Sequence, residues 1–254
     1  MTHEKITVLV VGATGSIGRH VVGQALEAGH ETRALVRDAS RGSLFPEGAQ
    51  PLVGDLTDAE TLRDAVRGVD GIVFTHGSHG GAQEAGAVDY GAVRNVLSVL
   101  ESPARIALMT AIGVTKRMPG HDAKRRGERL VRASGLPYTI VRPGWFDYNE
   151  PDEQQLVMLQ GDTRRASDPS DGVVSRAQIA QVLVASLTSD AADRKTLELV
   201  AEKGPAQAVL GPLFDALQAD PAGALDAVLD RDNMPLDQEP VGIVAELDAI
   251  RGRF

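Results

Sequence analysis

Short apolar runs alternate with amphipathic stretches along most of the chain. The first run, residues 6–11, is apolar apart from one threonine, which is typical of a strand covered by helices on both faces of a sheet. Similar runs predict strands at residues 31–36, 51–53, 71–75, 105–109, 138–142 and 196–200. Because helical patterns separate these runs, the sequence predicts βαβ units and an α/β fold with a doubly wound parallel sheet.

The segments between the strands have the spacing of helices. Helices are predicted at residues 17–27, 57–67, 89–100, 122–134 and 175–187. Two of them begin with a capping box, in which a hydroxyl residue is followed three positions later by Glu or Gln. The two boxes are Thr57 with Glu60 and Ser175 with Gln178.

Beyond Pro143 the alternation of strands and helices weakens. Residues 150–171 are rich in Asp, Gln, Ser and Pro, which predicts a long loop with one hairpin strand at residues 156–159. After the last strand, helical spacing continues in three pieces separated by Pro221 and Pro240. We therefore expect a small C-terminal helical appendage that covers a substrate cleft.

A glycine-rich segment, Gly12-Ala-Thr-Gly-Ser-Ile-Gly18, joins the first strand to the first helix. In such a loop one glycine permits the tight turn, a second lets the backbone approach a pyrophosphate, and a third lets the helix pack on the strand. The pyrophosphate then faces the amide groups and the positive dipole end of the helix. The residues of this loop expected to bind cofactor are Gly12, Thr14, Gly15, Ser16, Ile17 and Gly18.

The position of the glycine loop suggests a division of the chain into two regions with different functions. Residues 1–150 are predicted to form a Rossmann-type dinucleotide-binding domain. Residues 151–254 are predicted to supply a substrate loop, a closing helix and strand, and an acidic helical C-terminal region.

The residue that ends the second strand bears on the choice of cofactor. Arg37 lies there, 19 residues after Gly18, at the place where an acidic residue would accept hydrogen bonds from the ribose of NAD. An arginine pairs instead with the 2′-phosphate of NADP. The sequence therefore predicts NADP, and NAD remains the alternative because Asp38 comes next and offers a carboxylate to the ribose.

Four segments in this order resemble the atypical short-chain dehydrogenase/reductases, specifically the NmrA-like, NAD(P)-binding group. They are residues 12–18, 35–38, 54–56 and 138–144, and the similarity spans residues 5–187. The resemblance implies that Asp55 and Leu56 flank the adenine. It also implies a cofactor-lining set after the fourth strand and a set beside the nicotinamide: Thr75, His76 and Gly77, then Pro143, Gly144, Trp145 and Phe146.

The catalytic pattern of that superfamily is incomplete in this chain. Its reductases use a Tyr and a Lys four residues apart, so that phenol and ammonium share one helix face and the ammonium lowers the phenol pKa. Lys124 is similar to the family's lysine, and it is expected to bind the nicotinamide ribose. Gly120 stands where the tyrosine would be.

Three residues are candidates to replace the tyrosine. His121 lies three positions before Lys124, on nearly the same face if the helix begins early enough, and an imidazole transfers protons near neutral pH. Tyr148 follows the sixth strand and could reach the nicotinamide. Thr110 follows the fifth strand and could donate a hydrogen bond to a carbonyl.

Composition and charge limit the partners and the location. The chain has no cysteine, no apolar run near 18 residues and no signal-like N-terminus, so we expect a cytoplasmic protein that does not enter membranes. Residues 116–132 carry seven basic and two acidic side chains, whereas the whole chain has a net charge of −9. We interpret the basic stretch as a solvated helix face beside an anionic cofactor, and we expect no nucleic-acid partner.

These observations leave two classes of function open. In the first, the protein is an NADP-dependent oxidoreductase that reduces a small organic acceptor, because hydride transfer chiefly needs a positioned nicotinamide. In the second, it binds the dinucleotide without turnover and acts as a redox sensor. A sugar epimerase is a third and weaker alternative, since that chemistry depends on the missing tyrosine. A monomer or a homodimer is expected in each case.

Overall fold

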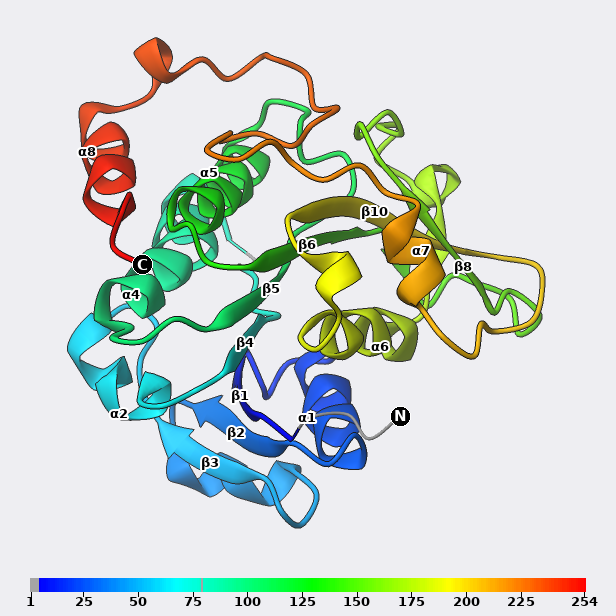
Figure 1. Cartoon of the computed structure of the whole chain (residues 1–254), viewed down its shortest axis with the longest axis horizontal. Coiled ribbons are helices and arrows are strands. Elements are labelled where there is room, and N and C mark those ends of the chain that lie inside the picture. The colour runs from blue at the N-terminus through cyan, green and yellow to red at the C-terminus, as the bar shows by residue number, and fades with distance from the viewer. Residues whose placement is uncertain (1–4, 79) are drawn as a thin grey trace.

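The computed structural model describes residues 5–78 and 80–254, and a single sheet organises this part of the chain (Figure 1). Its ten described strands run in the order β3-β2-β1-β4-β5-β6-β10-β9-β7, with β8 paired to β10. The strands are β1 (Thr7–Val11), β2 (Glu31–Val36), β3 (Gln50–Val53), β4 (Gly71–Phe74), β5 (Arg105–Met109), β6 (Tyr138–Pro143), β7 (Trp145–Phe146), β8 (Gln155–Leu159), β9 (Val173–Val174) and β10 (Lys195–Glu202). The six strands predicted first are parallel, which confirms the doubly wound α/β class.

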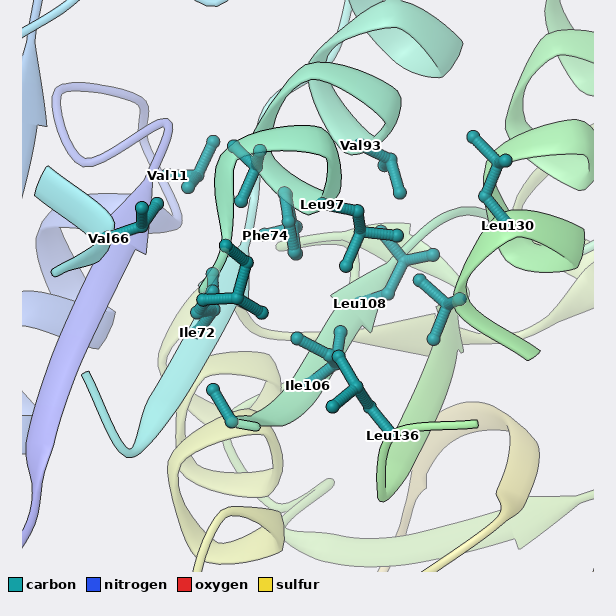
Figure 2. Close-up of a cluster of buried hydrophobic side chains, with 14 of the residues drawn as sticks. Val11, Val66, Ile72, Phe74, Val93, Leu97, Ile106, Leu108, Leu130 and Leu136 are labelled. Carbon is teal, nitrogen blue, oxygen red and sulfur yellow. The ribbon is translucent and has the colours of Figure 1, made fainter. Parts of the chain in front are cut away.

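Helices cover both faces of the sheet and bury two separate apolar layers. On one face α1 (Gly18–Glu27) and α6 (Arg176–Ser186) pack on inward residues such as Val8 and Val10. The other face carries α2 (Arg63–Val66), α4 (Gly91–Val99) and α5 (Pro119–Ala133), whose side chains meet Leu9 and Val11. Figure 2 shows this second layer, in which Phe74, Leu97 and Leu108 lie together. Alternate residues of each strand thus face opposite layers, as a fully covered sheet requires.

Two predicted helices differ from the structure. The segment after β3 begins with the 3₁₀ turn Ala59–Leu62, and its cap is Asp58, whose carboxylate accepts from the Glu60 amide at 3.1 Å, not Thr57. The predicted helix 89–100 begins earlier, with α3 (Ala82–Ala85) and a π-helical turn (Gly86–Tyr90) that leads into α4. The second capping box, Ser175 with Gln178, is confirmed.

The C-terminal region is less helical than its spacing predicted. The first and third pieces form α7 (Gly211–Asp215) and α8 (Val241–Ile250), but the piece between Pro221 and Pro240 consists of turns and bends apart from the 3₁₀ turn Leu236–Gln238. This middle piece crosses α5, and α8 packs beside α4 and α5 (Figure 1). Among the described helices none combines the length and the apolar character needed to cross a bilayer.

The basic face of α5 holds the middle piece, and the residue just before it, through ion pairs of buried arginines. Arg125 and Arg129 both pair with Asp226, and Arg132 pairs with Asp220 at 3.2 Å. All three arginines are buried. The interpretation of this stretch as a solvated face is therefore wrong, because long cationic side chains are buried when anionic partners compensate them.

Candidate functional site

The glycine loop follows the carboxyl end of β1, where the strand order reverses between β1 and β4, the point at which doubly wound sheets bind ligands. Gly12 has a φ of +83°, and a Cβ there would lie 2.7 Å from the backbone nitrogen of His76. A Cβ on Gly18 would clash with the carbonyl of Gly12. Gly12 therefore permits the close approach of the loop to the residues after β4, and Gly18 permits the close packing of α1 against the end of β1.

The crest of the loop is open to a ligand. Thr14, Gly15 and Ser16 are exposed, and the amide groups of Ser16 and Ile17 have no acceptor among the described residues. α1 has no side-chain cap, since Ile17 occupies the N-cap position. Free amides at a helix N-terminus form a site for an anion such as a diphosphate.

One cavity of about 340 Å³ lies between the loop and the end of β2. It is lined by Gly12, Thr14, Leu35, Val36, Arg37, Asp38, Arg41, Gly54 and Leu56. The two arginines are exposed and four residues apart, and sequence reasoning missed Arg41 because the 3₁₀ turn Ala39–Leu44 that positions it gives no helical spacing. A pair of guanidinium groups at this place fits a phosphate monoester.

The two carboxylates near this cavity are engaged with their own backbone. Asp38 accepts from the Ser40 amide at 2.8 Å, and this hydrogen bond lowers the pKa of Asp38. Asp55 accepts from the amide and hydroxyl of Thr57, both at 2.8 Å, and the amide hydrogen bond lowers the pKa of Asp55. Asp55 is exposed and does not line the cavity, unlike its neighbour Leu56.

The residues after β4 face the glycine loop. The Thr75 hydroxyl donates to the carbonyl of Val11 at 3.1 Å, whereas Gly77 is exposed. His76 is buried, and burial lowers its pKa to about 4, so its ring is neutral at pH 7. Its Nε2 lies 3.4 Å from the carbonyl oxygen of Asp89, and its buried Nδ1 has no partner among the described residues.

Lys124 is held beside this same loop. Its Nζ lies 2.8 Å from a carboxylate oxygen of Asp89, which also accepts from the amide and hydroxyl of Ser78. Burial alone would raise the pKa of Asp89, but Lys124 and Ser78 lower it below its ordinary value. Asp89 belongs to the π-helical turn, a local irregularity common at functional sites that sequence reasoning did not predict.

A second cavity, of about 320 Å³, lies at the ends of β5 and β6. It is lined by Ala111, Ile112, Gly113, His121, Pro143, Gly144, Trp145, Phe146, Ser167 and Asp171. The lining is mostly apolar, and His121 belongs to the first turn of α5, which begins at Pro119 as the argument for this residue required. The His121 Nδ1 lies 3.2 Å from the Lys116 carbonyl, so an Nδ1–H tautomer leaves Nε2 unengaged.

The other two candidates for proton transfer lie elsewhere. Tyr148 is 62% exposed and contacts Trp145 edge-on, with ring centroids 6.1 Å apart, outside the cavity lining. Thr110 is buried, and its hydroxyl donates to Glu128 at 2.7 Å, away from the cavity. Ser167 and Asp171 of the predicted substrate loop line this cavity, whereas the described residues of the C-terminal helical appendage do not.

Comparison with known proteins also indicates dinucleotide binding for most of the chain. A family model described as NAD(P)H-binding matches residues 12–190. The Bacillus subtilis protein named uncharacterized sugar epimerase YhfK is 30% identical over 206 residues, which cover 76% of this chain and 92% of that protein. A (4-alkanoyl-5-oxo-2,5-dihydrofuran-3-yl)methyl phosphate reductase of Streptomyces griseus is 29% identical over 256 residues, which cover 97% of this chain and 81% of that protein.

A solved structure supports the fold. The anaerobillin reductase ChuY of Escherichia coli O157:H7 aligns with a TM-score of 0.61 at 23% identity, covering 79% of this chain and 100% of that one. At this level of identity the likeness concerns the fold.

Proposed function

This chain belongs to the NAD(P)H-binding family, and from that premise we propose that it is an NADP(H)-dependent oxidoreductase. Its acceptor is a small organic molecule of the quinone, aldehyde or enone type. The observation that carries the proposal is the cavity in which His121 faces the apolar segment Pro143–Phe146. The name of the Streptomyces griseus relative, a reductase, agrees with this reaction class.

The residues present fit a dinucleotide phosphate. The free amides of Ser16 and Ile17 suit the diphosphate, and Arg37 with Arg41 suits the 2′-phosphate. Asp38 caps its own turn, so it is poorly placed to serve a ribose in place of a phosphate. The cofactor is therefore proposed to be NADP(H), with NAD(H) bound more weakly.

Each remaining residue has a role in this proposal. The cofactor supplies the hydride when it is bound, and the chain supplies position and a proton. Lys124, fixed by Asp89, binds the nicotinamide ribose, while Trp145 and Phe146 exclude water from the acceptor. The doubly protonated His121 ring donates its Nε2 proton to the acceptor oxygen and is left as the neutral Nδ1–H tautomer bonded to the Lys116 carbonyl, the part played by a tyrosine in related reductases.

The preference for NADP depends on Arg37. The variant Arg37→Ala should bind NADP⁺ about 10-fold to 100-fold more weakly, the range for losing a charge-assisted hydrogen bond, and should bind NAD⁺ as before. Titration calorimetry with both cofactors measures this change. Equal affinity of the unmodified protein for NAD⁺ and NADP⁺ would remove the proposed role of Arg37.

Turnover is tested by NADPH oxidation, followed spectroscopically, with panels of quinones, aldehydes and enones. For an acceptor that is reduced, His121→Ala should lower kcat about 100-fold, the lower end for the loss of a general acid. Tyr148→Phe is the matched control, because Tyr148 lies outside the cavity lining and should leave kcat unchanged. The reverse pattern would transfer the proton donor to Tyr148.

The absence of the tyrosine supports a second candidate function, a dinucleotide sensor that does not turn over a substrate. A Cβ on Gly120 would meet nothing within 4 Å, so the place of the family's phenol is open space in this chain. A dinucleotide sensor without turnover agrees with this gap. If NADPH binds and quenches the fluorescence of Trp145, the only tryptophan, while none of the acceptor classes is reduced, the sensor function replaces the enzyme.

A further inference from the structure

Arg176, the first residue of α6, connects the glycine loop to the wall of the apolar cavity. Its Nε donates to the Ser16 hydroxyl at 3.0 Å, and its guanidinium pairs with Asp147. The same group lies over the ring of Phe146, with 5.5 Å from Cζ to the ring centroid. One cationic side chain therefore touches the cofactor loop and the cavity-lining segment together.

The hydrogen bonds of this side chain leave donors that face no acceptor. Nε is engaged by Ser16 and Nη1 by Asp147, while Nη2 has no acceptor within the described part of the chain. The Ser16 hydroxyl accepts from Arg176, so its own hydrogen is available to another acceptor. These donors lie beside the amides of Ser16 and Ile17, which are also free.

A cation beside a diphosphate at this loop would add to the attraction of the helix amides. Arg37 and Arg41 lie at the end of β2, and Lys124 is paired with Asp89. Arg19, on the first turn of α1, is exposed, and its side chain has no hydrogen bond or ion pair among the described residues. Arg176 is the cation in contact with the crest of the loop, where guanidinium groups suit phosphate oxygens.

Asp147 also holds the Arg176 guanidinium in place. Asp147 has a φ of 56°, in the left-handed region, and its amide donates to the Val174 carbonyl at 3.0 Å. The backbone amide of Arg176 donates to the Asp147 carboxylate at 3.0 Å. Strain of this kind persists where surrounding contacts hold it, often at ligand sites. A preorganised guanidinium loses little conformational freedom when it binds an anion.

We propose that Arg176 binds the diphosphate of the dinucleotide through Nη2, with the Ser16 hydroxyl donating beside it. The proposal rests on the proposed cofactor function and adds a ligand from the closing helix, outside the glycine loop itself. Asp147 and Phe146 contact the same guanidinium. Binding of the diphosphate therefore also stabilises the position of Phe146, which lines the acceptor cavity.

Two ligands separate this role from a structural one. NADP⁺ carries the diphosphate, whereas adenosine 2′-phosphate carries the group proposed for Arg37 and no diphosphate. Arg176→Gln should weaken NADP⁺ about 10-fold to 100-fold, as expected for a lost charge-assisted contact, and leave adenosine 2′-phosphate unchanged. Arg176→Lys should recover most of the NADP⁺ affinity because it keeps the charge. The control Arg19→Gln should stay within about threefold of the parent, since no hydrogen bond or ion pair holds the exposed Arg19 side chain at the loop.

Calorimetry on the four proteins gives distinct outcomes. Loss of affinity for both ligands in Arg176→Gln, or no recovery in Arg176→Lys, would assign Arg176 a structural role and overturn the proposal. Unchanged NADP⁺ affinity in Arg176→Gln would overturn it as well while leaving the cofactor function intact. If the parent itself binds neither NADP⁺ nor NAD⁺, the proposed function fails and this proposal fails with it.

Discussion

Replacing Gly15 with valine should abolish cofactor binding and leave the fold intact. A Cβ on Gly15 would meet only the Gly12 carbonyl oxygen, at 3.1 Å, so the chain itself accommodates the side chain with a small shift. Gly15 is not among the glycines with positive φ, and the backbone therefore tolerates an L-residue. The rest of the valine occupies the open space above the loop, where the diphosphate must approach the amides. We expect an affinity loss of at least about 1000-fold, or about 4 kcal/mol.

The matched control is Gly23→Val, the same chemical change in the helix that follows the loop. A Cβ on Gly23 meets nothing within 4 Å, and this residue lies in the middle of α1, away from the loop. Circular dichroism should be near normal for both variants. NADP⁺ should raise the melting temperature of Gly23→Val and of the parent but not of Gly15→Val. An equal thermal shift in all three proteins would make the loop structural only.

Local signals in the sequence were sufficient for the parallel sheet and the glycine loop. The turn at Gly12, the packing at Gly18 and the capping box at Ser175 each depend on residues within a few positions, and the structure has all three. Arg37 directly follows β2, because the apolar run that forms the strand ends at Val36. Such features are set by backbone conformation and periodicity, which a single sequence displays.

Features that depend on distant pairing could not be predicted in this way. The residues between Pro221 and Pro240 have helical spacing, but they form turns and bends, and Asp226 and the preceding Asp220 bind arginines of α5. The same ion pairs explain why a basic helix face proved to be buried. Nothing in a local window reports a partner about a hundred residues away, so tertiary contacts override the helical preference.

The residues of the candidate site also differ in whether local sequence signals or distant contacts place them. The glycine loop was predicted as a binding site from its motif, and the segment after β6 from the family resemblance. Asp89, Arg41 and Arg176, to which we assign roles by proposal, were not predicted, because they are placed by a π-helical turn, a 3₁₀ turn and a helix start. Thr110 was singled out by its place after β5, yet its orientation depends on Glu128, a partner from another element.

The second large effect is expected from Glu128, a fully buried carboxylate at the centre of the ionic cluster. It accepts from Thr110 at 2.7 Å and from Arg142 at 2.6 Å, and Arg142 also binds Asp230 at 2.7 Å. Burial opposes the charge of Arg142, but Glu128 and Asp230 raise its pKa well above the ordinary value. Removing one anion therefore leaves a buried cation partly uncompensated.

Glu128→Gln keeps the shape of the side chain and removes its charge, so its effect is electrostatic. The free energy of unfolding should fall by about 3–5 kcal/mol, the range for breaking a buried ion pair. Urea denaturation measures the change. Glu60→Gln is the control, because Glu60 pairs with Arg63 in solvent and should change stability little. A loss in Glu128→Gln no larger than in Glu60→Gln would mean that water or neighbouring groups compensate Arg142, and that the cluster does not hold the C-terminal region on α5.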